Sequence, residues 1–283
     1  MGRLDQDALD TPVSGISTES GVTVTEGNTL TYGRDHGDSV GESVAIGVGA
    51  RTNNAYFDSF DGAQKVAVGY EALRGGVSYA STAVGYRAGA EPNADLVGIA
   101  ALGHKAAEKN KGSYVTAIGM SAAADNTKGR VTAVGFQAGY KNTGNNITSL
   151  GFYAARDNTA EDVTAIGYTA GKDNTGNESV FVGRESGRNN TGNNTVAVGY
   201  KTATGGDLDD PSTMGNRNVG IGYEAIENNQ ASGVIAIGFR AGKNVQTNDQ
   251  LIITQRDGTR RMVMDLTTGD LQITGTLEEN ATL

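Results

Sequence analysis

Apolar and small residues recur through the middle of the chain in one short phrase, separated by polar stretches rich in Asn, Thr and Gly. The phrase reads Ala, Ile or Val, Gly, aromatic, any residue, Ala and often Gly, as in 133–139 and 165–171. The Gly after the aliphatic residue is called the anchor here. Anchors fall at Gly47, Gly69, Gly85, Gly103, Gly119, Gly135, Gly151, Gly167, Gly183, Gly199, Gly222 and Gly238.

The spacing of the anchors predicts a stack of similar coils. Every step from Gly103 to Gly199 is sixteen residues, and constant spacing with variable side chains between is typical of repeat architectures. We therefore predict an all-β solenoid of about 16-residue coils over 39–244. Residues 1–38 form an N-terminal attachment or capping segment in this scheme, and 245–283 a β-rich C-terminal segment.

Within one coil, Val, Thr and Ile before the anchor favour a short strand, and Asn, Asp and Gly, as in 173–177, favour turns. Two short strands and two turns are expected per period. The aliphatic residue directly before each anchor is expected to align into the dry core. The residue two before the anchor, Ala in most copies but Phe181 in one, would form a small apolar stripe on the opposite face of the strand. Association of several rolls, each formed by one chain, would hide this stripe.

Aromatic residues directly after the anchors also align from coil to coil. The favoured interpretation is a structural stacking ladder, because ladders in repeat proteins are usually packing devices. The alternative is a row of sugar-binding platforms. The aromatic members are Tyr70, Tyr86, Phe136, Phe152, Tyr168, Tyr200, Tyr223 and Phe239.

Composition narrows the classes of partner. Gly makes up 42 of 283 residues, which is typical of a turn-rich chain. The net charge of -9 argues against nucleic acid and anionic membrane surfaces as partners. Cys is absent, which excludes disulfides and thiolate metal sites. No apolar run is long enough to span a bilayer as a helix, and we expect no signal peptide because no apolar stretch follows Met1.

No constellation of nucleophile, base and orienting group stands out, so no enzyme activity and no cofactor are expected. Residues 220–225 match a dinucleotide-binding pattern, but they fall in register with the repeat and precede no helix. His36 and His104 are the only histidines and build no convincing zinc site. Asp207, Asp209 and Asp210 lack the spacing of a calcium loop, which favours a solvated loop.

Two insertions are candidate receptor-contact loops. The first lies between Gly47 and Gly69, where aromatic rings and carboxylates could grip a glycan or, the favoured interpretation, fold back over the first coils. The second runs from Asp207 to Met214. The candidate residues are Tyr56, Phe57, Asp58, Phe60, Asp61, Asp207, Asp209 and Asp210.

The phrase, with Asn-Thr-Gly-Asn following it, resembles the head repeats of trimeric bacterial adhesins and of bacteriophage tail fibres, over about three quarters of the chain. The resemblance implies a left-handed parallel β-roll and three rolls packed around a threefold axis. It also implies a virion fibre that attaches to a host-surface glycan or protein. By their position, residues 1–38 either dock on other virion or tail proteins or form a capping coil.

The ends of the chain favour the phage over the adhesin, because no signal peptide, heptad stalk or membrane barrel is visible in the sequence. Residues 251–277 alternate around two turns and resemble the segment before the self-cleaving chaperone of phage fibres. Leu283 is thus either a cleaved end or a plain terminus. The alternatives are a bacterial adhesin head on the cell surface and a purely structural spacer or capsid decoration fibre.

Overall fold

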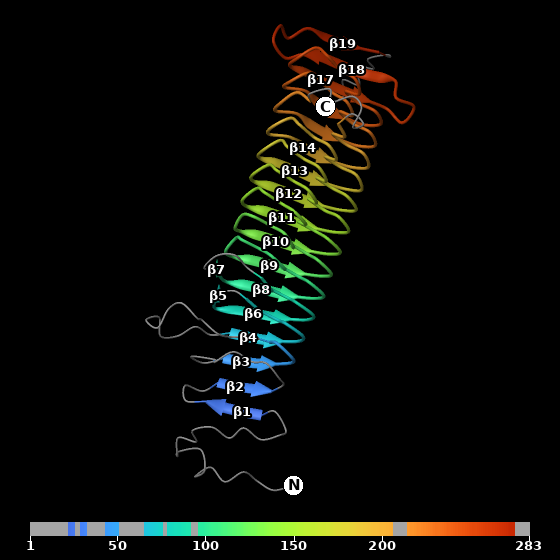
Figure 1. Cartoon of the computed structure of the whole chain (residues 1–283). Coiled ribbons are helices and arrows are strands. Elements are labelled where there is room, and N and C mark those ends of the chain that lie inside the picture. The colour runs from blue at the N-terminus through green and yellow to red at the C-terminus, as the bar shows by residue number, and fades with distance from the viewer. Residues whose placement is uncertain are drawn as a thin grey trace, which may run out of the picture. The chain divides into compact units, whose positions relative to one another are not determined.

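The computed structural model describes residues 22–25, 29–32, 43–50, 65–75, 78–91, 96–205 and 214–274. Its regular elements in this part of the chain are all strands (Figure 1), and none of the described residues form a helix that could cross a membrane. The chain divides into two units, Met1–Tyr140 and Lys141–Leu283. Each unit is a stack of coils that contributes one main strand per coil.

In the first unit, β1 (Val22–Thr25) runs antiparallel to β2 (Thr29–Tyr32), and from β2 onward each strand of the stack pairs in parallel with the next. A short second sheet joins β5 (Ser78–Tyr79) to β7 (Leu96–Val97). The remaining strands are β3 (Ser43–Ile46), β4 (Lys65–Val68), β6 (Ser81–Val84), β8 (Ile99–Leu102), β9 (Val115–Ile118) and β10 (Val131–Val134).

In the second unit, β11 to β17 pair in parallel, and the last strands turn back to form an antiparallel meander. Parallel pairing therefore runs from β2 to β10 in one unit and from β11 to β17 in the other. The strands are β11 (Ile147–Leu150), β12 (Val163–Ile166), β13 (Ser179–Val182), β14 (Val196–Val198), β15 (Val219–Ile221), β16 (Ile235–Ile237), β17 (Gln250–Thr254), β18 (Arg260–Asp265) and β19 (Leu271–Ile273).

The predicted parallel β-solenoid with turns of about 16 residues is confirmed. Val163 pairs with Ser179, and Ile166 with Val182, each sixteen residues further on. The domain boundaries at 38/39 and 244/245 stay predictions. The parallel pairing itself includes β2, which precedes residue 39, and β17, which follows residue 244.

The anchors permit this stacking because no other residue fits there. Gly167 has φ +138°, and a Cβ added to it would lie 2.5 Å from the carbonyl oxygen of Gly183 in the next coil. Thr254 stands where the anchor after Gly238 would fall and lacks a positive φ. The chain does not make the anchor turn there, and it reverses into β18 instead.

The expectation of two strands per coil is wrong for most coils. After the anchor, residues with positive φ alternate with ordinary ones, as at Thr169 (φ 52°), Gly171 (59°) and Asp173 (56°). Overlapping turns close by hydrogen bonds such as Lys172 N–H to Thr169 O (3.3 Å). The intervening N–H groups donate to neighbouring coils, as Thr169 does to Phe152 O (2.8 Å). These bonds between coils stabilise a backbone that L-residues rarely adopt alone.

The assignment of the core face is also corrected. Ala165, two residues before its anchor, is fully buried, whereas Leu150, directly before its anchor, is 47% exposed. The coil is thin, and the Ala residues three past the anchors, such as Ala170, fill it from the other side. At these two positions most coils carry only small side chains, and the aliphatic residues directly before the anchors lie on the outside.

A ladder of buried Asn side chains closes one edge of the interior, seven residues after the anchors. Asn158 Nδ2 donates to Asn142 Oδ1 (2.8 Å) and to the carbonyl oxygen of Ala160 (2.7 Å), and Asn158 Oδ1 accepts from Asn174 Nδ2 (2.9 Å). In the first unit, Asn126 donates to Asn110 Oδ1 (2.7 Å) in the same way. Each amide thus satisfies polar atoms that no water reaches.

Candidate functional site

The receptor-contact candidates lie outside the described residues, and so does His36. They therefore stay predictions. The residues concerned are Tyr56, Phe57, Asp58, Phe60, Asp61, Asp207, Asp209 and Asp210.

The described residues instead present a different surface, which we call the outward face. It consists of the side chains on the outer side of the strands, one and three residues before each anchor, and of the residue directly after the anchor. Ile118 and Leu102 in the first unit are 41% and 51% exposed, and Ile221 in the second is 42% exposed. Rows of half-exposed aliphatic side chains on successive strands are uncommon on soluble monomers and mark interaction surfaces.

The aromatic residues of the outward face stack on one another. The ring centroids of Tyr70 and Tyr86 are 5.3 Å apart and those of Tyr86 and His104 are 4.9 Å apart, with nearly parallel planes. A sugar platform needs a free ring face, but inside the ladder each face is covered by the next ring. This geometry favours the stacking interpretation over the sugar-binding one.

In the second unit the same pattern holds for Phe152 and Tyr168 (5.2 Å) and for Tyr223 and its neighbours Tyr200 and Phe239. Arg184 interrupts the row, with its guanidinium carbon 5.4 Å from the Tyr168 ring centroid and 5.6 Å from that of Tyr200. A stacked guanidinium preserves the ladder by cation–π attraction.

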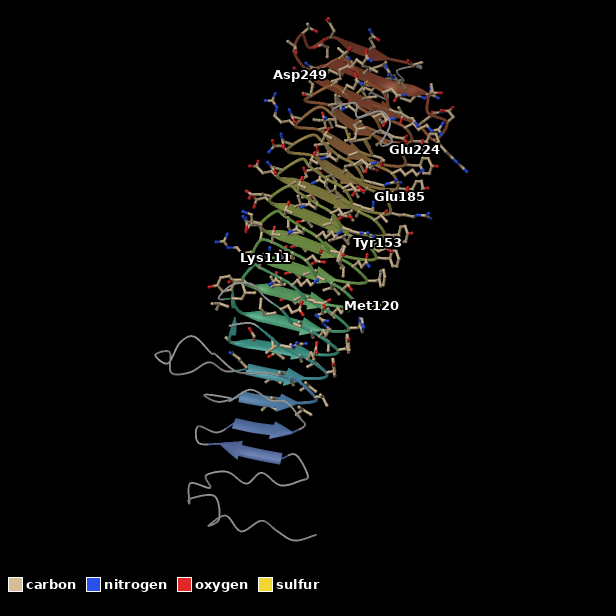
Figure 2. The ribbon with its side chains drawn as sticks, in the orientation of Figure 1. Lys111, Met120, Tyr153, Glu185, Glu224 and Asp249 are labelled. Carbon is tan, nitrogen blue, oxygen red and sulfur yellow. The ribbon has the colours of Figure 1, made fainter. Side chains whose placement is uncertain are left out.

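The overlapping turns carry charged side chains, and we call this side the turn face. Figure 2 shows Tyr153, Glu185 and Glu224, each two residues after an anchor, along one edge of the second unit, and Asp249 on the other. Arg240 Nε and Lys243 Nζ lie 2.8 and 3.0 Å from Glu224 Oε2. Burial alone would raise the pKa of Glu224, but hydrogen bonds from Lys243, Tyr223 and Arg240 outweigh it and lower the pKa to about 2.

The turn face of the first unit is similarly paired. Arg87 lies between carboxylates of three coils, with Nη2 2.5 Å from Glu91 Oε1, Nε 2.7 Å from Glu108 Oε1 and Nε 3.7 Å from Glu71 Oε2. The turn face is therefore charged and the outward face is apolar, so the two sides of a coil suit different environments. Water suits the turn face, and a protein surface suits the outward face.

The dinucleotide-like pattern of residues 220–225 has a structural role. Gly220 lies in β15, and a Cβ there would be 2.4 Å from Ile226 Cγ1; Gly222 is an anchor with φ +134°. The dinucleotide-like pattern is thus an ordinary coil. Lys65 is buried in β4, and burial lowers its pKa to about 8. No group of three His, Asp or Glu residues in the described ranges could hold a metal ion.

Sequence reasoning missed the outward face because alternation distinguishes the two faces of a strand without saying which is inside. Side-chain volume was the available signal. The Ala-rich positions, such as Ala117 and Ala133, match a thin interior, and the aliphatic positions beside them do not.

Comparison of the chain with models of protein families, with curated proteins and with solved structures finds no match in any of the three.

Proposed function

We propose that the chain is a non-enzymatic structural fibre protein whose rolls associate side by side through the outward face, as a homotrimer. The observation that carries the proposal is the apolar outward face, with residues such as Leu102 and Leu150 about half exposed. Burial of such a surface contributes about 25 cal/mol per Å². The charged turn face would remain in water.

The proposed setting is a bacteriophage virion, where a trimeric tail fibre of left-handed β-rolls attaches to a host-surface glycan or protein. The support is the resemblance of the repeat phrase to phage tail fibres and trimeric adhesin heads. In this proposal residues 1–38 bind other virion proteins, and no cofactor, nucleic acid or membrane insertion is involved. The alternatives are a bacterial adhesin head and a structural spacer or capsid decoration fibre.

Immunogold electron microscopy with an antibody against the chain distinguishes these settings. The strain that encodes the chain would be examined before and after phage induction. Label on tail fibres of released particles is the expected result. Label on the surface of uninduced cells would overturn the phage assignment in favour of the adhesin, and label on capsids would favour the decoration fibre.

Host attachment needs a separate test. The purified, fluorescently labelled chain would be incubated with a panel of bacterial strains, and phage adsorption would be measured with and without an excess of the chain. We expect saturable binding to the strains that the phage adsorbs to and competition with adsorption. Binding to none of those strains would contradict the attachment role and favour a structural spacer.

A further inference from the structure

The outward face changes width along the second unit. On β11 and β12 the residue directly before the anchor is aliphatic, but the one three before it is Thr148 or Thr164. From β13 onward both positions are aliphatic. The paired residues are Val180 and Val182, Val196 and Val198, Val219 and Ile221, and Ile235 and Ile237.

The widened face continues from the parallel stack onto the antiparallel meander. Leu251 and Ile253 on β17 pair with Ile235 and Ile237 on β16 and therefore share their side of the sheet. Across the meander, Leu251 pairs with Met264 and Met264 with Leu271, while Ile253 pairs with Met262 and Met262 with Ile273. Directly opposite residues of neighbouring strands point to the same face.

The meander lacks a core of its own. No residue of β18 or β19 is buried, and Leu271 and Ile273 are 51% and 39% exposed. A small antiparallel sheet needs one apolar face covered by another element to be stable in water. Ile252, on the other side of β17, is fully buried in the coil interior, so the uncovered apolar surface is the outward one.

The area of the widened face is large enough to contribute to the association of three copies. The widened face has two aliphatic side chains on each of the seven strands β13 to β19. If each presents about 50 to 60 Å², one copy offers about 700 to 840 Å². A trimer would divide this area between the two neighbours of each copy and bury about 2,100 to 2,500 Å² in total.

The periodicity of the face identifies its occupant. Its side chains repeat at the spacing of neighbouring strands, about 4.8 Å. A partner that packs in register against many successive strands repeats at the same rise, and a second copy of this chain does so. Closed association of identical subunits uses such periodic surfaces without leaving one uncovered.

We propose that β13–β19, including the meander, form the principal segment through which copies of this chain bind one another. This inference rests on the proposed side-by-side association and assigns it to one segment. A shorter run with two aliphatic residues per strand occurs on β3 and β4, at Val44, Ile46, Val66 and Val68. The two strands β3 and β4 carry fewer aliphatic side chains than the seven strands of β13–β19, so we assign them a smaller contribution.

The test compares matched substitutions at the same strand position. V180T/V196T narrows the widened face, V44T/V66T makes the same change on β3 and β4, and L271K/I273K charges the meander. Thr keeps the β-branched shape of Val and its strand preference. Oligomer mass would be followed by sedimentation velocity over a dilution series, with circular dichroism to verify the fold.

We expect V180T/V196T and L271K/I273K to raise the concentration of half-dissociation by at least about tenfold, and V44T/V66T to raise it by less than about threefold. Equal effects of the two Val-to-Thr pairs, or no effect of either β13–β19 variant on an oligomeric parent, would overturn the assignment to this segment alone. A parent chain that is monomeric throughout would overturn the proposed association itself.

Discussion

At the scale of single residues, the fold depends on positions where only one size of side chain fits. Gly167 illustrates the strictest case, because its φ of +138° disfavours any side chain and an added Cβ would lie only 2.5 Å from the carbonyl oxygen of Gly183. Gly269 has a positive φ as well (+81°), but no atom lies within 4 Å of the place its Cβ would take. The pair separates the cost of backbone conformation from the cost of stacking.

We predict that Gly167→Ala lowers the free energy of unfolding of the second unit by at least about 3 kcal/mol, because strain and overlap with the next coil add. Gly269→Ala should cost about 1 kcal/mol, from its φ alone. Urea denaturation followed by circular dichroism measures both. Similar losses for the two variants would mean that close approach of the coils is not what requires Gly at the anchor.

Phe181 shows compensation between neighbouring positions. It occupies an interior site that is Ala in most coils, and it is fully buried. Its ring takes the space above Gly171 and Gly187, where an added Cβ would lie 3.2 Å from Phe181 Cδ2 and 2.1 Å from Cδ1. Some other coils place Ala at the equivalent position, as at Ala155, and others place Gly, as at Gly139.

Phe181→Ala should therefore cost about 3 to 5 kcal/mol, from lost burial and the remaining cavity. Gly187→Ala should strongly destabilise the parent chain but cost only about 1 kcal/mol, from its φ of +67° alone, in the Phe181→Ala background, which gives a favourable coupling in a double-mutant cycle. Hydrogen exchange at β12 to β14 would locate the effect. Additive costs would show that the ring and the glycine do not share one space.

At the scale of elements, ladders of like residues join the coils. The Asn158 amide bonds to both neighbouring coils and to its own backbone inside the protein, whereas Asn177 accepts from the Glu161 N–H on an exposed edge (2.8 Å). A buried hydrogen-bonding group that loses its partner costs much more free energy of unfolding than an exposed group, which can bond to water instead.

We predict that Asn158→Ala costs about 2 to 3 kcal/mol and Asn177→Ala less than about 1 kcal/mol. Thermal unfolding of both variants under the same conditions measures the difference. If the two losses are equal, the buried ladder contributes no more than an exposed one, and the interior amides would have another reason to be there.

The turn-face cluster around Glu224 predicts a pH dependence. The pKa of Glu224 falls on folding to about 2, so the folded chain binds fewer protons than the unfolded chain between about pH 4.5 and 2. The stability that Glu224 contributes is therefore complete above that window and is lost as the pH falls through it.

Glu224→Gln should destabilise the second unit by about 1 to 2 kcal/mol at pH 7, and the gap to the parent should shrink towards pH 2. Denaturation midpoints at pH 7, 4 and 2.5 test this. A gap that stays constant with pH would mean that the charge of Glu224 contributes no stability.

At the scale of elements, the sequence predicts that coils stack better than it predicts the conformation of the chain within one coil. Constant anchor spacing and the requirement for Gly follow from stacking alone, so the stack of coils could be predicted from them. The parallel pairing of the strands was expected from the resemblance. The turns could not, because Thr169 and Glu185 adopt positive φ, which local propensity disfavours and hydrogen bonds between coils stabilise. The inward face was misassigned because the more apolar residues were placed inside without regard to the small volume of the interior.

At the scale of the whole molecule, the account depends on the apolar outward face being covered. The net charge of -9 and the charged turn face keep the chain soluble. Large exposed aliphatic residues do not contribute to solubility and therefore need another explanation. Their regular placement on strand after strand is explained if copies of the chain pack together there. The candidate receptor loops, by contrast, were predicted from their composition and stay predictions.

The most direct test of the central claim is the solution mass of the purified chain, measured by light scattering coupled to size exclusion at micromolar concentration. The account predicts three times the chain mass of 29.1 kDa. A monodisperse species of 29.1 kDa would contradict it, because the outward face would then be stable in water without a partner.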